Sequence, residues 1–225
     1  MKRNNWMKSE YIICAGILII SVFIFITHNG AGPMLGDLDV AMFYAINHIN
    51  NPLLKDMAAT ASDVGSKDSN ILMLMFILIS FMFFVSMIKQ EQEIKRLALI
   101  LIISIVISGM LVDPLKSMFG VERPYVKLKG VNVHSGGEWI NEKMLTWQNF
   151  ENNSFPSGHA MITFTALGVL WEYRRLRILL FIFLLTAMFF IVYVGQHYVS
   201  DIIVGGTIGY LVGYLSRKTF DKLGI

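Results

Sequence analysis

The sequence is short of charged residues. Asp, Glu, Lys and Arg make up only 16% of its 225 residues, against roughly a quarter in a typical soluble domain. Hydrophobic residues account for 55%, and the mean hydropathy is +0.57. These values exclude an ordinary soluble protein. They predict an integral membrane protein whose surroundings are the lipid bilayer.

The sequence also has little cysteine and a small net charge. The one cysteine, Cys14, lies within an apolar run, so no intramolecular disulfide can form. The formal net charge is +3, and the basic residues occur in short clusters, which gives no support to a nucleic-acid partner. The sequence has no internal repeat or low-complexity tract. Its length fits a single domain, residues 1–225.

Apolar runs account for most of the chain. Six of them predict helices that cross a hydrocarbon core of ~30 Å, at about residues 11–27, 70–88, 97–115, 158–171, 178–194 and 202–215. The fourth and sixth runs are short because each begins at a polar motif. We therefore predict an all-α fold, an integral membrane bundle of six transmembrane helices.

The basic residues predict the orientation of this bundle. With the N-terminus in the cytoplasm, 12 of the 19 basic residues fall in short cytoplasmic segments: Lys2, Arg3, Lys8, Lys89, Lys95, Arg96, Arg174, Arg175, Arg177, Arg217, Lys218 and Lys222. The positive-inside rule then favours a multi-pass cell-membrane protein with both termini cytoplasmic. The first run has the basic start of a signal peptide but no small-residue cleavage site before His28, so we expect a retained anchor helix.

Two longer segments lie between these runs. Residues 35–63 mix apolar and polar positions at approximately helical spacing. This pattern predicts an amphipathic helix at the outer surface, or a helix that only covers the bundle. Residues 125–155 have no long apolar run but contain Trp139 and Trp147. They form either a lid or headgroup contact, or an interfacial loop anchored by the tryptophans.

Polar residues suited to phosphoryl transfer cluster at the ends of the last helices. Hydrolysis of a phosphate ester without a metal needs a nucleophile, an acid for the leaving oxygen and fixed positive charge. His197 is the candidate nucleophile. Asp201 follows it at i+4 on the same helix face and would orient the imidazole, as in a catalytic triad. Taken alone, the pair is also common at helix ends.

The other candidates come from two segments further upstream. His159 is the candidate general acid, and Ser157 and Gly158 before it would cradle phosphate at a helix N-terminus. In a purely structural interpretation, Ser157 caps that helix and His159 extends to the interface. Lys116 and Arg123 would complete the phosphate site, or lie at the membrane surface as ordinary snorkelling cations.

Asp113 complicates this part of the site, because it lies three residues before Lys116. An ionisable residue so close to a membrane span is itself a functional candidate. Alternatively, it forms an ion pair with Lys116 and weakens the hold of that lysine on phosphate.

In order and spacing, these motifs resemble the type 2 phosphatidic acid phosphatase family of membrane lipid phosphatases. The family signature is Lys, six residues, Arg-Pro; then Pro-Ser-Gly-His; then Ser-Arg, five residues, His, three residues, Asp. Residues 116–124 and 156–159 match the first two parts, and His197 and Asp201 match the end of the third. Phe190 and Ile191 stand where the family has Ser-Arg.

The resemblance implies a metal-independent lipid phosphatase without a cofactor. His197 would form a phosphohistidine oriented by Asp201, and His159 would protonate the leaving group. The other motif residues, Lys116, Arg123, Ser157 and Gly158, would bind phosphate. The expected substrate is a membrane lipid, a polyprenyl diphosphate, phosphatidate or phosphatidylglycerophosphate, bound at the extracytoplasmic face. The resemblance leaves the oligomeric state open.

The loss of the family arginine leaves three interpretations open. Lys127, Lys129 or Gln196 replaces the lost contact; the enzyme is slower or prefers another headgroup; or the protein is a weak or inactive relative that binds or transports phospholipid. A channel or transporter is less consistent with the pattern, because its ionisable residues would lie near the middle of the membrane. The motif residues instead collect at one interface.

Overall fold

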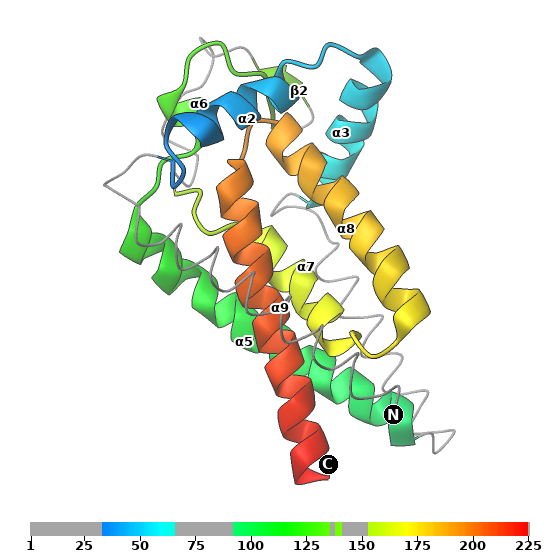
Figure 1. Cartoon of the computed structure of the whole chain (residues 1–225). Coiled ribbons are helices and arrows are strands. Elements are labelled where there is room, and N and C mark those ends of the chain that lie inside the picture. The colour runs from blue at the N-terminus through cyan, green and yellow to red at the C-terminus, as the bar shows by residue number, and fades with distance from the viewer. Residues whose placement is uncertain (1–32, 66–91, 136–137, 141–152, 225) are drawn as a thin grey trace.

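The computed structural model describes residues 33–65, 92–135, 138–140 and 153–224, and most of these residues are helical (Figure 1). Three helices are long and apolar enough to cross a membrane: α5 (Gln92–Phe119), α8 (Arg174–Tyr193) and α9 (Val199–Leu223). They contain nearly all of the predicted spans 97–115, 178–194 and 202–215, and polar or charged turns extend them. The first two predicted spans, 11–27 and 70–88, lie outside the described residues.

A shorter apolar helix, α7 (Gly158–Val169), corresponds to the predicted span 158–171. Its 12 residues extend about 18 Å at 1.5 Å per residue, well short of a ~30 Å hydrocarbon core. Helix α7 packs against α5 and α9. It therefore fills the interior of the bundle. Its N-terminus lies deeper along the long helices than α2 and α3 do (Figure 1).

Glycines set the close packing of α7 against α9. A Cβ atom at Gly209 would overlap the carbonyl oxygen of Met161, and one at Gly213 would overlap that of Thr165. From the opposite side, Gly168 lies against the backbone of Tyr210. Such close approach is typical of small-residue contacts between membrane helices. It holds α7 at a fixed separation from the middle of α9.

Two helices, not one, cover the segment predicted as a single amphipathic helix over residues 35–63. Helix α2 (Asp37–Asn47) ends before His48, and α3 (Pro52–Gly65) begins at Pro52. The residue before a proline disfavours helical dihedrals, whereas proline itself fits the first turn of a helix. Pro52 therefore separates the two helices. Helix α2 packs on the adjoining ends of α8 and α9 (Figure 1).

A small hairpin is an addition to the predicted all-α fold. Strands β1 (Val133–Ser135) and β2 (Glu138–Ile140) pair antiparallel, after the one-turn helix α6 (Pro124–Lys127). Trp139 of β2 makes edge contacts with the rings of His134 and Tyr193, at centroid distances of 5.2 and 6.0 Å. Trp139 thus packs on the end of α8, and Trp147 lies outside the described residues.

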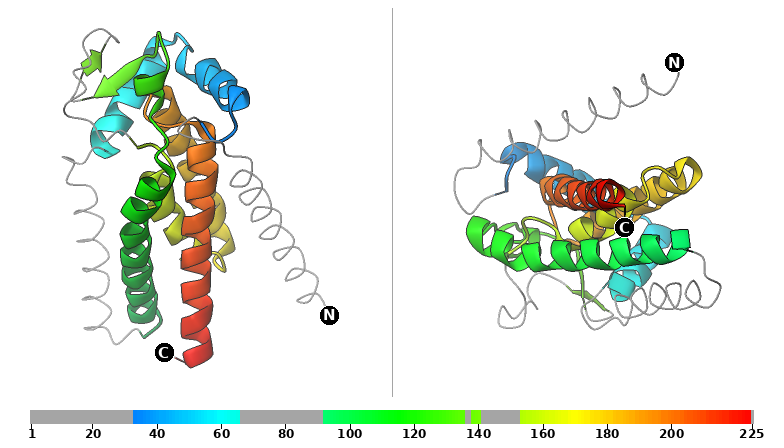
Figure 2. Two further views of the ribbon diagram at one scale, coloured as in Figure 1. Left: turned by 90° about the vertical axis from the view of Figure 1, so that its left-hand side faces the viewer. Right: turned by 90° about the horizontal axis from the view of Figure 1, so that it is seen from below.

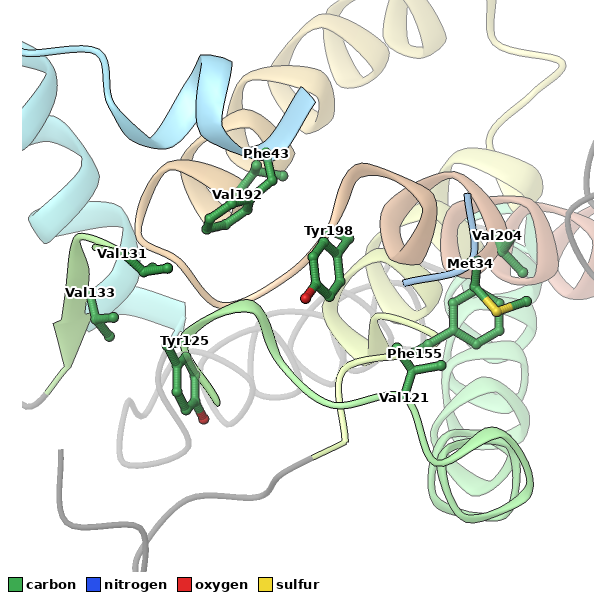
Figure 3. Close-up of a cluster of buried hydrophobic side chains, with 10 residues drawn as sticks. All are labelled: Met34, Phe43, Val121, Tyr125, Val131, Val133, Phe155, Val192, Tyr198 and Val204. Atoms are coloured by element: carbon green, nitrogen blue, oxygen red, sulfur yellow. The ribbon is translucent and has the colours of Figure 1, made fainter. Parts of the chain in front are cut away.

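The small elements gather at one end of the long helices. In the side view of Figure 2, α5 and α9 run side by side, with α2, α3 and the hairpin at the same end. A buried apolar cluster fills this end (Figure 3). It draws on α2 and the residues just before it, the 121–133 segment, Phe155, the end of α8 and the start of α9: Met34, Phe43, Val121, Tyr125, Val131, Val133, Phe155, Val192, Tyr198 and Val204. The three predicted motifs border this cluster.

Candidate active site

Three helix ends meet beside the apolar cluster. Gly158, the first residue of α7, lies against the side chain of Val112, one turn before Lys116 in α5. Gly205 of α9 lies against the backbone of Ser157, because a Cβ there would be 2.5 Å from the Ser157 carbonyl oxygen. The packing therefore brings the segments that carry the three motifs to one place.

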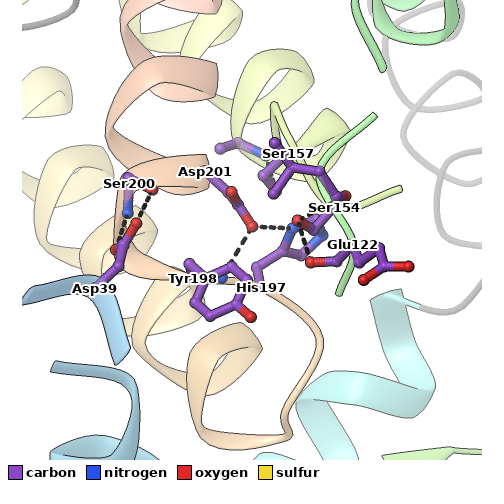
Figure 4. Close-up of polar contacts among 10 residues, drawn as sticks. Asp39, Glu122, Ser154, Ser157, His197, Tyr198, Ser200 and Asp201 are labelled. Carbon is purple, nitrogen blue, oxygen red and sulfur yellow. Dashed lines mark hydrogen bonds and ion pairs between the residues drawn. The ribbon is translucent and has the colours of Figure 1, made fainter. Parts of the chain in front are cut away.

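His197 and Asp201 are in direct contact. The imidazole Nδ1 lies 3.2 Å from Asp201 Oδ2, and the two side chains are only 1% and 0% exposed (Figure 4). The same Oδ2 accepts the backbone N–H of Tyr198 at 2.8 Å. A proton on Nδ1 that is donated to Asp201 leaves Nε2 with its lone pair available. This geometry suits attack by Nε2 on an electrophile.

The electrostatic surroundings of His197 favour the neutral imidazole. Burial lowers the pKa of His197 well below its usual range, and the charges of Arg123, Lys116 and His159 lower it further. These three side chains thus lie close enough to act on His197 by charge. Because only the neutral ring has a free lone pair, these surroundings favour the form of the imidazole that a nucleophilic role would need.

Arg123 brings an unused donor to the same place. Its Nε is buried and, among the residues that the structure describes, has no hydrogen-bond partner. The segment before it is fixed by Ser154, whose N–H donates to the Val121 carbonyl at 2.7 Å, and by a bridge between Glu122 and Asn153. A buried guanidinium N–H that no described residue accepts is suited to bind an anion such as phosphate.

Ser157 holds α7 against α9 as well as capping it. Its Oγ accepts the N–H of Ala160 at 3.4 Å, which is the helix-capping contact expected from its position. Its own N–H donates to the carbonyl of Asp201 at 3.0 Å. The backbone N–H of Ser157 is thus committed to α9. The first turn of α7 nevertheless directs the positive end of its dipole toward the His197–Asp201 pair.

Lys116 lies in the last turn of α5 and is half-buried. Its carbonyl accepts the side-chain N–H of Asn153 at 3.3 Å, which links α5 to the segment leading into α7. Asp113 is exposed, and no ion pair joins it to Lys116 within the described part of the chain. The alternative in which Asp113 neutralises Lys116 is therefore not the arrangement in this structure.

Phe190 and Ile191, which replace the family Ser-Arg pair, lie at the end of α8 and make packing and backbone contacts there. Phe190 is buried against Ala58 and Tyr193. Ile191 is half-buried, and its carbonyl accepts the N–H of Gln196 at 3.3 Å. Of the three residues suggested as replacements for the arginine, Gln196 is half-buried next to His197, whereas Lys127 and Lys129 are exposed.

The sequence analysis did not identify two buried polar residues of α2 that hold this helix next to the site. Asp39 accepts the N–H of Ser200 at 3.0 Å and also its hydroxyl. Asn47 donates to the carbonyls of Tyr193 and Asn132, both at 2.8 Å. With Phe43 they recur every four residues, so all three share one buried helix face. Polar residues on the apolar face of an amphipathic segment were the signal that could have revealed them.

Metal ligands do not gather at this place or elsewhere in the described residues, where no three His, Cys, Asp or Glu side chains form a group that could hold a metal ion. The groups that do converge are imidazoles, a carboxylate and basic side chains. Together with helices able to span a membrane, they define a class of protein, the membrane phosphatases.

Comparison with known proteins gives the family. Residues 97–225, more than half of the chain, match the PAP2 superfamily, and the protein belongs to this superfamily. Members of the superfamily with solved structures include membrane phosphatases, and the protein is likewise a membrane phosphatase. No curated protein sequence matches the chain.

Two solved structures resemble the fold over most of its length. LpxE from Aquifex aeolicus is 26% identical with a TM-score of 0.59, and the match covers 80% of this chain and 95% of that one. A transmembrane PAP2-type phosphatidylglycerolphosphate phosphatase from Bacillus subtilis has a TM-score of 0.66 at 19% identity. That match covers 93% of this chain and 96% of the other. The second likeness concerns the fold alone.

Proposed function

We propose that the protein hydrolyses a lipid phosphate or diphosphate without a metal, through a phosphohistidine formed on His197. The observation that carries this proposal is the buried contact of His197 with Asp201, beside an Arg123 whose Nε has no hydrogen-bond partner among the described residues. This combination supplies a neutral nucleophile and a hydrogen-bond donor for an anion within one site. Membership of a phosphatase superfamily supports the same reaction class.

The first chemical step transfers the phosphoryl group to the enzyme. His197 Nε2 attacks phosphorus, a P–N bond forms, and the bond from phosphorus to the leaving oxygen breaks. His159 donates its proton to that oxygen, and the leaving group departs as a lipid alcohol or a lipid monophosphate. Asp201 stabilises the positive charge that develops on the imidazole through its contact with Nδ1.

The second step regenerates the enzyme. A water molecule attacks the phosphorus, the P–N bond breaks, and His159, now neutral, takes the proton of the water. Inorganic phosphate leaves, and His197 is again a neutral imidazole. Arg123, Lys116 and the start of α7 at Ser157 and Gly158 would hold the phosphoryl oxygens in both steps.

The reaction is proposed to take place at the extracytoplasmic face, with both chain termini in the cytoplasm. The described residues support this orientation, because the ends of the bundle differ in their basic residues. Arg96, Arg217 and Lys218 lie at the end of α5 and α9 opposite to the site and pair with acidic residues there. An excess of basic residues marks the cytoplasmic side of membrane proteins.

An extracytoplasmic site would suit a polyprenyl diphosphate, the substrate expected from the bacterial and archaeal enzymes that the motifs resemble. Phosphatidate and phosphatidylglycerophosphate are the other candidates. The last is also the type of substrate in the name of the Bacillus subtilis structure. All three present a terminal phosphate on an oxygen that His159 could protonate.

A second candidate function is that of a weak or inactive relative that binds or transports phospholipid. The observation in its favour is Ile191, which places an apolar side chain where the family has an arginine. Loss of one charged stabiliser of a transition state costs on the order of 10²–10³ in rate. The histidines and Asp201 would then serve binding rather than turnover.

Phosphate release distinguishes these candidates. The detergent-purified protein is offered polyprenyl diphosphate, phosphatidate and phosphatidylglycerophosphate in excess EDTA, beside His197→Ala. We expect release by the wild type that EDTA leaves intact and His197→Ala abolishes. Release that EDTA stops would contradict the metal-independent reaction. The absence of release from every lipid would favour the lipid-binding relative.

A further inference from the structure

The first turn of α9 takes a hydrogen-bond acceptor from another part of the fold. Helices usually begin after a short polar residue that accepts the first free N–H groups, but Tyr198 occupies that position here. The N–H of Ser200 donates instead to Asp39 Oδ1 at 3.0 Å, although the two residues are 161 positions apart. A carboxylate from α2 therefore caps the helix that carries Asp201.

Asp39 is buried and fully engaged in this role. The residue is 0% exposed. Its Oδ2 accepts the Ser200 hydroxyl and, at 3.2 Å, the N–H of Leu35. These donors offset the cost of burying a carboxylate, and the helix dipole favours negative charge at this end of α9. These hydrogen bonds thus hold the Asp39 carboxylate in one orientation against the start of α9.

The same face of α2 also contacts the residue that follows His197. The rings of Phe43 and Tyr198 meet edge to face, with centroids 5.8 Å apart. In Figure 4, Asp39 and Ser200 lie on one side of Asp201, and His197 lies on the other. Helix α2 therefore contacts the segment between His197 and Asp201 at two points, Tyr198 and Ser200.

We propose that Asp39 is a positioning residue for the nucleophile. Ser200 precedes Asp201 directly, so a shift in the start of α9 moves the carboxylate that orients the His197 ring. A displacement of ~1 Å in a catalytic group can cost about 10²-fold in rate. This inference rests on the function proposed above, and it assigns to α2 a part in catalysis beyond covering the bundle.

The test compares three variants of α2. Asp39→Ala removes both acceptor atoms, whereas Asp39→Asn keeps one oxygen for the Ser200 N–H and loses the other. Asp37→Asn makes the same chemical change at an exposed position of the same helix and is the control. We expect kcat to fall about 10²-fold in Asp39→Ala and by less in Asp39→Asn, with KM little changed. Asp37→Asn should match the wild type.

Hydrogen exchange of the peptide covering the start of α9 gives a second readout that does not require activity. Both Asp39 variants should exchange faster there than the wild type and Asp37→Asn. If the wild type releases no phosphate, the proposed function fails, yet exchange still tests whether Asp39 fixes α9. If Asp39→Ala does not fold, Asp39→Asn carries the test. Unchanged exchange, or unchanged kcat in folded Asp39 variants of an active enzyme, would overturn the inference.

Discussion

Burial of His197 next to basic side chains has consequences for both catalysis and stability. Burial and the charges of Arg123, Lys116 and His159 lower its pKa, which keeps the ring neutral and able to attack. The same arrangement is unfavourable to the protonated ring, because a charged imidazole would be buried among positive charges. Nucleophilicity at neutral pH is therefore coupled to a loss of stability in acid.

This coupling predicts how stability depends on pH. The pKa of His197 is lowered in the folded protein, so below the unfolded value of ~6.5 the unfolded chain binds the extra proton and stability falls. The limiting slope is about 1.4 kcal/mol per pH unit. We expect the thermal midpoint to fall between pH 7 and pH 5 more in the wild type than in His197→Asn.

His48→Gln is the matched control for this measurement. His48 is an exposed histidine, so its removal should leave the acid sensitivity of the wild type in place. Parallel loss of stability in the wild type and in His197→Asn would contradict a buried, neutral His197.

At the scale of elements, local sequence predicted which segments are helical better than the contacts between them. Hydropathy located α5, α8 and α9, because a run of apolar residues is a property of one segment. The α7 cap at Ser157 was also open to prediction from its residue type and position. The break between α2 and α3 at Pro52 was not predicted, although proline gives a local reason for it.

Contacts across long sequence distances could not be obtained in this way. The bond from Ser200 to Asp39 joins residues 161 positions apart, and Asn47 bonds to Tyr193 from 146 positions away. The hairpin β1–β2 has strands of three residues, too short for a clear alternating pattern. The motif residues were found from their chemistry and spacing along the chain, whereas the contacts that hold the start of α9 depend on tertiary packing.

At the scale of the whole molecule, the motif residues lie at one end of the long helices, and the Lys and Arg ion pairs of α5 and α9 lie at the other end. The motif residues lie where α5 ends and where α7 and α9 begin. Arg96 pairs with Asp221, and Lys218 pairs with Glu172, at the opposite ends of α5 and α9. This polarity along the helices is the physical basis for the proposed orientation, in which the lipid headgroup reaches the site from the extracytoplasmic side.

Cysteine labelling tests that orientation. In a Cys14→Ala background, Lys127→Cys would report the site end and Glu172→Cys the opposite end, and both positions are exposed. We expect a membrane-impermeant thiol reagent to label Lys127→Cys in intact cells and Glu172→Cys only after permeabilisation. The reverse pattern would place the site in the cytoplasm and exclude the proposed topology.

The most direct measurement of the central claim is a search for the covalent intermediate. The wild type is mixed with a lipid carrying a radiolabelled terminal phosphate, quenched within one turnover, and digested to locate the label. We predict a label on His197 that is stable in alkali and lost in acid, and that is absent from His197→Asn. Turnover of the lipid without any such label, or a label on another residue, would contradict the assignment of His197 as the nucleophile.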